Sequence, residues 1–98
     1  MTPEQLRVFV TVAEREHMTQ AAHALNMTQS TASAAIAALE SRHGVTLFDR
    51  IGRAISLTEE GRAFLPEARA VLARLAEAEA MLAETRGLAR GHVRLIAS

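Results

Sequence analysis

The sequence lacks cysteine, tryptophan and tyrosine altogether, and its three aromatic residues are all phenylalanine. Without cysteine, disulfide bonds and thiolate metal sites are excluded, which fits a reducing compartment. The longest apolar run, residues 34–39, is far below the ~20 residues that a membrane span needs. The first residues also lack the basic region and the apolar stretch of a signal peptide. These absences predict a soluble cytoplasmic protein.

Positive charge is not in excess either. Eleven arginines balance eleven acidic residues, and residues 1–58 hold five of each. A nucleic-acid-binding domain usually shows a basic surface, so in this chain such a surface could only be local, around Arg42, Arg50 and Arg53. The charge balance therefore predicts weak non-specific binding to DNA, steeply lost with salt, and a need for two copies to bind well.

Alanine is the abundant residue, with 20 of the 98 positions. It favours helix intrinsically and buries little surface, so the chain is predicted to be mainly α-helical around a modest core. The length allows one small domain and an additional helix.

Capping signals divide the N-terminal half into three helices. Thr2 as N-cap, Pro3 and Gln5 form the start of a first helix, which should end near Glu16. Thr19 is the expected N-cap of a short second helix. The apolar positions at helical spacing, which should face the core, are Leu6, Phe9, Val10 and Ala13 in the first helix and Ala21, Ala22 and Leu25 in the second.

A turn at Asn26, a residue that tolerates a left-handed conformation, leads into the third predicted helix. Thr28 caps this helix and Gly44 stops it. Its buried stripe is predicted to be Ala32, Ala35, Ile36 and Leu39. Two short strands, residues 47–48 and 55–57, follow with Gly52 in the turn between them. This order of elements predicts a winged helix-turn-helix, mainly α with a small β-hairpin wing.

Thr58 is expected to cap a long final helix, which would run to about Thr85 and be roughly 40 Å long. A domain of under sixty residues is too small to cover that length, so the same helix of a second copy is the expected partner. A following domain is the alternative. The predicted dimer interface consists of Phe64, Leu65, Ala68, Val71, Leu72, Leu75 and Leu82. Gly87 and Gly91 should end the helix, and residues 93–96 are expected to begin a strand of a missing domain.

Polar side chains crowd the first turns of the third helix. They are Thr28, Gln29, Ser30, Thr31 and Ser33. Such side chains, with the free N–H groups of a helix start, can bind DNA phosphates, and Gln29 can make a two-pronged contact to adenine. Taken alone, the cluster also fits a simple cap with solvated neighbours. Its place between a short helix and a hairpin favours DNA binding, and Thr19 joins the candidate set.

Arg50 and Arg53 flank the hairpin turn. Arginines on a wing can enter the minor groove or grip its phosphates. The ordinary alternative is a pair of surface charges, one of them satisfied by Asp49.

Catalysis finds no support in the sequence, which has no nucleophile elbow and no phosphate loop. The four histidines lack metal-ligand spacing. The chain is therefore predicted not to be an enzyme, with no catalytic residues, no metal and no cofactor.

These residues together resemble the N-terminal region of LysR-type transcriptional regulators. The matching positions are Phe9, Thr19, Ala21, Ala22, Leu25, Asn26, Gln29, Ser33, Ile36, Leu39, Glu40, Gly44, Val45, Leu47, Phe48, Arg50, Arg53, Leu57, Thr58 and Gly61. The resemblance implies a bacterial DNA-binding regulator in which residues 1–58 bind DNA, 59–89 form a linker helix, and 90–98 begin a small-molecule-sensing domain. It implies linker helices paired antiparallel in a dimer, tetramers of the whole protein, and interrupted palindromes as targets.

By matching positions, the resemblance implies that Gln29, Ser30 and Ser33 read the major groove and that Arg50 and Arg53 serve the wing. Two positions depart from the family pattern. Ala34 stands where many members have a basic residue, and Ser30 where many have proline. Two other functions stay open: a winged-helix module for dimerisation or protein binding without DNA reading, and a DNA binder of another regulator family, such as the molybdate-responsive ones.

Overall fold

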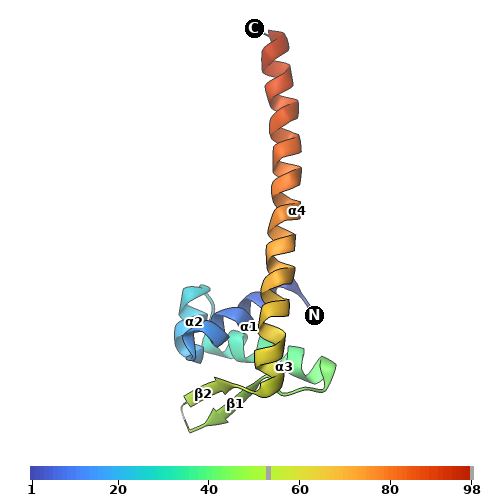
Figure 1. Cartoon of the computed structure of the whole chain (residues 1–98). Helices are drawn as coiled ribbons and strands as arrows, with labels where there is room; N and C mark the ends of the chain where they lie inside the picture. Colours follow the sequence, from blue (N-terminus) through green and yellow to red (C-terminus); the bar gives the residue numbers. More distant parts are fainter. Residues whose placement is uncertain (53, 98) are drawn as a thin grey trace.

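A computed structural model describes the backbone of residues 1–52 and 54–97 and the side chains up to residue 87, Arg53 excepted. The elements are α1 (Pro3–Arg15), α2 (Met18–Ala24), α3 (Gln29–His43), β1 (Phe48–Ile51), β2 (Ala54–Leu57) and α4 (Glu59–Ala97). The three short helices and the hairpin gather around one end of α4, whose remainder projects away from them (Figure 1). The predicted winged helix-turn-helix with a long following helix is confirmed.

The start of α1 forms the capping box that its sequence predicts. The Thr2 hydroxyl accepts a hydrogen bond from the Gln5 backbone N–H at 3.1 Å, and the Gln5 side chain accepts from the Thr2 N–H at 3.0 Å. The helix stops at Glu16, which has a left-handed φ of 52°. The start of α1 thus follows from a local signal, and its end lies where the sequence predicts it.

The predicted N-cap of α2 is wrong by two residues. His17, not Thr19, caps the helix, because its side-chain Nδ1 accepts from the Gln20 N–H at 3.1 Å. This earlier start turns Met18 into the core, where it is buried. Asn26 has the expected left-handed φ of 55°, and it turns the chain from α2 toward α3.

The core is centred on Phe9 of α1. The centroid of its ring lies 5.4 Å from the ring centroid of Phe48 in β1 and 5.1 Å from that of Phe64 in α4. Three aromatic rings in tilted contact therefore join the first helix, the hairpin and the long helix. From α3, the predicted residues Ala32, Ile36 and Leu39 are buried, and Ala35 is half-buried against the same core.

The base of the hairpin is fixed by hydrogen bonds to neighbouring helices. The Glu40 carboxylate on α3 accepts from the backbone N–H groups of Leu47 at 2.7 Å and Phe48 at 3.3 Å. The Thr58 hydroxyl donates to the Thr46 carbonyl at 2.6 Å and caps α4 by accepting from the Gly61 N–H at 3.0 Å. The hairpin is thus held to the ends of α3 and α4.

Helix α4 is longer than predicted. It passes through Gly87 and Gly91 and continues to Ala97, so residues 93–96 are helical and the expected strand there is wrong. A strand needs a partner for its backbone hydrogen bonds, whereas a helix satisfies them within the segment. Within residues 1–52 and 54–97, no helix is both long and apolar enough to cross a membrane.

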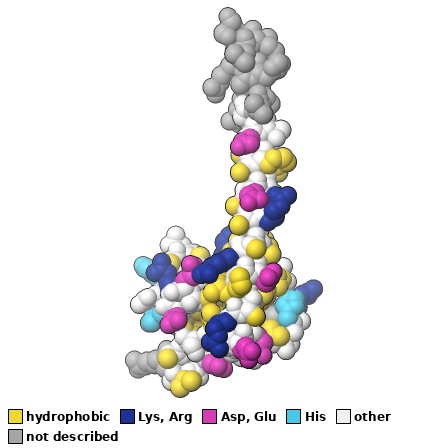
Figure 2. Space-filling model, viewed as in Figure 1, with side chains coloured by type: hydrophobic (Ala, Val, Ile, Leu, Met, Phe, Trp, Pro, Cys, Tyr) yellow, Lys and Arg dark blue, Asp and Glu magenta, His cyan; other side chains and the backbone are white. Residues whose placement is uncertain are grey.

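Part of the predicted dimer stripe belongs to the core of the chain itself. Ala68 is fully buried in this core and has no surface for a second copy to cover. Phe64, Leu65 and Leu72 are partly buried against the core from α4, and their place in a dimer interface stays a prediction. Farther along, Val71 and Leu82 are 50% and 64% exposed. Figure 2 shows hydrophobic side chains where α4 meets the other helices and again farther up the helix.

Candidate nucleic-acid interface

Three of the predicted DNA-binding residues line one groove. Thr19 enters it from α2, Gln29 from the first position of α3, and Arg50 from β1. The groove has a volume of about 440 Å³, and its other lining residues are His17, Met18, Gly52, Ala54 and Ile55. The structure thus brings together residues up to 31 positions apart (from Thr19 to Arg50) on one open surface.

The first turn of α3 is capped and strongly polar. The Thr28 hydroxyl accepts from the Thr31 N–H at 3.1 Å, and the two threonine hydroxyls lie 2.8 Å apart in a second hydrogen bond. Ser30, like Gln29, is exposed. Thr28 therefore has a structural role as cap, while its neighbours present hydroxyl and amide groups to solvent beside the backbone N–H groups of the helix start.

The hairpin turns one face toward the helices. Arg50 is paired with Ile55 in the antiparallel ladder, and this pair lies on the face that also carries Phe48. The Arg50 guanidinium Nη2 donates to the Ser33 hydroxyl on α3 at 3.4 Å. The hairpin is thus connected directly to the second turn of α3. The second predicted wing arginine, Arg53, lies outside the described residues.

This arrangement agrees with a comparison against known families. Residues 3–62 match the model of bacterial regulatory helix-turn-helix proteins of the LysR family. The chain belongs to the LysR family. The family assignment made from the sequence is therefore confirmed, and the relatives of the chain are transcriptional regulators.

Solved structures of LysR proteins have the same fold. The DNA-binding domain of CbnR in complex with DNA is 37% identical with a TM-score of 0.78, over 89% of this chain and 99% of that one. The DNA-binding domain of BenM on its benA site 1 DNA is 32% identical with a TM-score of 0.81, over 87% and 99%.

Curated relatives are longer than this chain. The probable hydrogen peroxide-inducible genes activator of Mycobacterium xenopi is 55% identical over 67 residues, which are 68% of this chain and 35% of the relative. The RuBisCO operon transcriptional regulator of Allochromatium vinosum is 38% identical over 91 residues, 93% of this chain and 30% of the relative. The chain thus spans about a third of the length of these LysR relatives.

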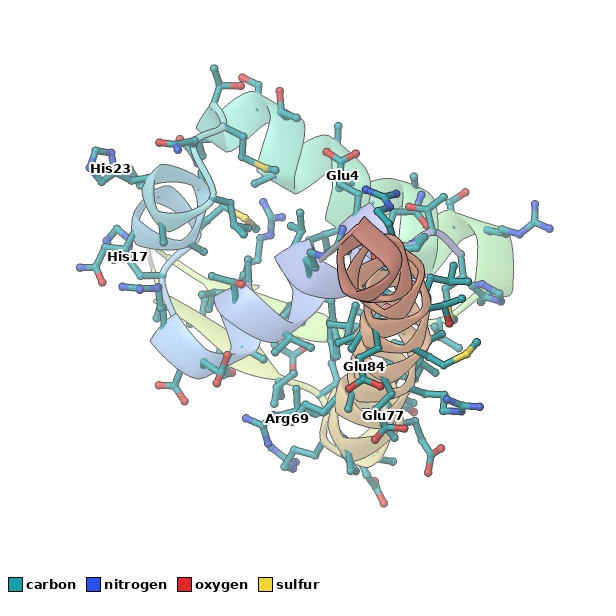
Figure 3. All side chains as sticks on the ribbon, turned by 90° about the horizontal axis from the view of Figure 1, so that it is seen from above. Glu4, His17, His23, Arg69, Glu77 and Glu84 are labelled. Atoms are coloured by element: carbon teal, nitrogen blue, oxygen red, sulfur yellow. The ribbon has the colours of Figure 1, made fainter. Side chains whose placement is uncertain are left out.

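Two residues that build the site were not predicted from the sequence. His17 lines the groove and caps α2, and it projects from α2 on the side away from α4, as His23 does (Figure 3). Histidine is an uncommon N-cap, so the residue type at position 17 did not indicate the start of a helix. Glu40 binds the backbone at the base of the hairpin. In the sequence, only its position between Leu39, which is buried, and the first strand indicated that it could do so. Among the described residues, no group of acidic, cysteine or histidine side chains is arranged to hold a metal ion.

Proposed function

We propose that this chain is the DNA-binding module of a LysR-family transcriptional regulator and binds double-stranded DNA in a sequence-specific manner. In this proposal α3 lies in the major groove, and the hairpin contacts the adjacent backbone or minor groove. The observation that carries it is the single groove in which Thr19, Gln29 and Arg50 meet. The DNA complexes of the structurally similar CbnR and BenM domains support it.

The first turn of α3 has the chemistry that DNA recognition requires. Gln29 is exposed at the first position of the helix, so its amide can reach base edges without displacing another element. A glutamine amide can donate to N7 and accept from N6 of adenine at once, and the free N–H groups of a helix start favour nearby phosphates. Base reading is accordingly assigned to Gln29, with Ser30 and Thr31 as its neighbours on the same turn.

The chain is further proposed to bind DNA as a dimer through α4. Val71, Met81 and Leu82 are 50%, 56% and 64% exposed on that helix, and the neighbouring Leu75 is half-buried. Covering this apolar surface with the same helix of a second copy would present two α3 helices to two half-sites of an interrupted palindrome. For the whole protein we propose a tetramer and a further domain that binds a small-molecule effector.

Replacing Gln29 with alanine is expected to abolish the base preference at one position of each half-site. A two-pronged contact contributes about 1–3 kcal/mol of discrimination, so roughly 5- to 150-fold selectivity at that base pair should disappear. The measurement is competition binding against duplexes that differ at single base pairs. Gln20→Ala is the matched control, because Gln20 is an exposed glutamine on α2 outside the groove lining. An equal loss on every duplex would make Gln29 a positioning contact only.

A further inference from the structure

The recognition helix α3 carries no charge where it would meet DNA. From Gln29 to Leu39 it contains only uncharged side chains, and the first charged residue, Glu40, is acidic and bound to the hairpin base. Contacts to phosphates dominate the affinity of proteins for DNA, and positively charged side chains supply most of this contribution. A cation near α3 must therefore come from another element.

Arg50 is placed to supply it. Its side chain leaves β1 on the face that carries Phe48 and Ile55, so it points toward the helices and not out from the hairpin. Its Nη2 donates to the Ser33 hydroxyl at 3.4 Å, across 17 positions of sequence. Arg50 also lines the groove that Gln29, the proposed base reader, lines. A wing residue thus lies beside the surface of α3.

The Ser33 hydroxyl is the partner of this contact. The residue is half-buried on the second turn of α3, and its hydroxyl oxygen accepts the bond from Arg50. A long arginine side chain that is already held in place before DNA binds loses less conformational entropy on binding. Because the bond is exposed and long, it should contribute little to the stability of the fold.

We infer that Arg50 is the cation of the α3 surface and that Ser33 is a positioning residue that acts on DNA through it. In this arrangement Arg50 contacts a phosphate flanking the major groove beside Gln29, and Ser33 does not read a base. The inference rests on the proposed function, since it concerns how the same surface binds DNA.

A double-mutant cycle tests the inference. The affinities of the wild type, Ser33→Ala, Arg50→Ala and the double variant are measured on a duplex that the wild-type chain has selected from a random pool, over a series of salt concentrations. We expect Arg50→Ala to weaken binding about tenfold and to reduce the slope of log K against log salt by about one. Ser33→Ala should weaken binding about threefold in the wild type and cause no further loss when Arg50 is absent.

Ser30→Ala is the matched control, since Ser30 is an exposed serine one turn earlier on α3. Combined with Arg50→Ala, it should give the product of the two separate losses. Equal losses from Ser33→Ala with and without Arg50 would overturn the inference, because Ser33 would then act independently. A fall in the thermal midpoint that explains the Ser33→Ala loss would overturn it as well. Failure of the wild-type chain to select any duplex would instead refute the proposed function.

Discussion

Replacing Gly61 with alanine is expected to destabilise the fold by about 2 kcal/mol. Gly61 lies on the first turns of α4, where a Cβ atom would press directly against the Leu47 backbone carbonyl and lie 2.8 Å from the Leu57 side chain. Such overpacking costs roughly 1–3 kcal/mol, and here the cost falls at the upper end because the obstructing atom belongs to the backbone. The higher helix propensity of alanine offsets about 1 kcal/mol at most. The midpoint of thermal unfolding should fall by about 10 °C.

Gly87→Ala is the matched control on the same helix. Nothing lies within 4 Å of a Cβ atom at Gly87, so this change should leave the midpoint unchanged or raise it slightly. Both variants are compared by circular dichroism at the same protein concentration. A midpoint for Gly61→Ala equal to that of the wild type would contradict the close approach of α4 to the base of the hairpin.

The double substitution Val71→Glu with Leu82→Glu is expected to produce a folded monomer that binds its operator at least about 100-fold more weakly than the wild type. Both side chains are at least half exposed, so the charges should not disturb the core of the chain. In a dimer, however, they would place like charges in an apolar interface. Losing simultaneous contact with two half-sites removes an avidity that is typically 10²- to 10⁴-fold.

Light scattering coupled to size-exclusion chromatography measures the mass, and fluorescence anisotropy measures the affinity. Ala73→Glu with Ala80→Glu is the control: both residues are exposed, and they lie on the opposite side of α4, since each residue rotates the helix by about 100°. The control should remain a dimer with wild-type affinity. A double variant at residues 71 and 82 that stays dimeric would show that copies do not meet through this part of α4.

The elements that the sequence predicts well are those with local signals. These signals are the capping box of Thr2 and Gln5, the left-handed backbone of Asn26 and the N-cap Thr28. Each involves residues that lie within three or four positions of one another. Such signals do not depend on the rest of the fold. They were therefore sufficient to place α1, the turn and α3, and with them the polar residues at the start of α3.

The features that could not be predicted depend on distant parts of the chain. The stripe on α4 is continuous in the sequence, and nothing local distinguishes Ala68, which packs against its own core, from Leu82, which stays exposed. The difference between buried and exposed positions along the stripe appears only when α1 and the hairpin are placed beside α4. The bond from Arg50 to Ser33 is of the same kind, because it spans 17 positions and depends on where the hairpin crosses α3.

The balanced charge also has a consequence for the proposed mechanism. With eleven basic and eleven acidic residues, electrostatic attraction to DNA is weak overall, so affinity depends on a few placed contacts. Gln29 on α3 and Arg50 on the hairpin are proposed as two such contacts in each copy. The proposal therefore requires two copies on one duplex, which makes the arrangement of half-sites its most direct consequence.

Selection of duplexes from a random pool tests sequence-specific binding by a dimer most directly. The purified chain is incubated with the pool at moderate salt, and the retained duplexes are sequenced. The proposal predicts enrichment of two half-sites related by a dyad, with a fixed spacing between them. A folded dimer that enriches no sequence would contradict it, as would enrichment of a single half-site without a dyad.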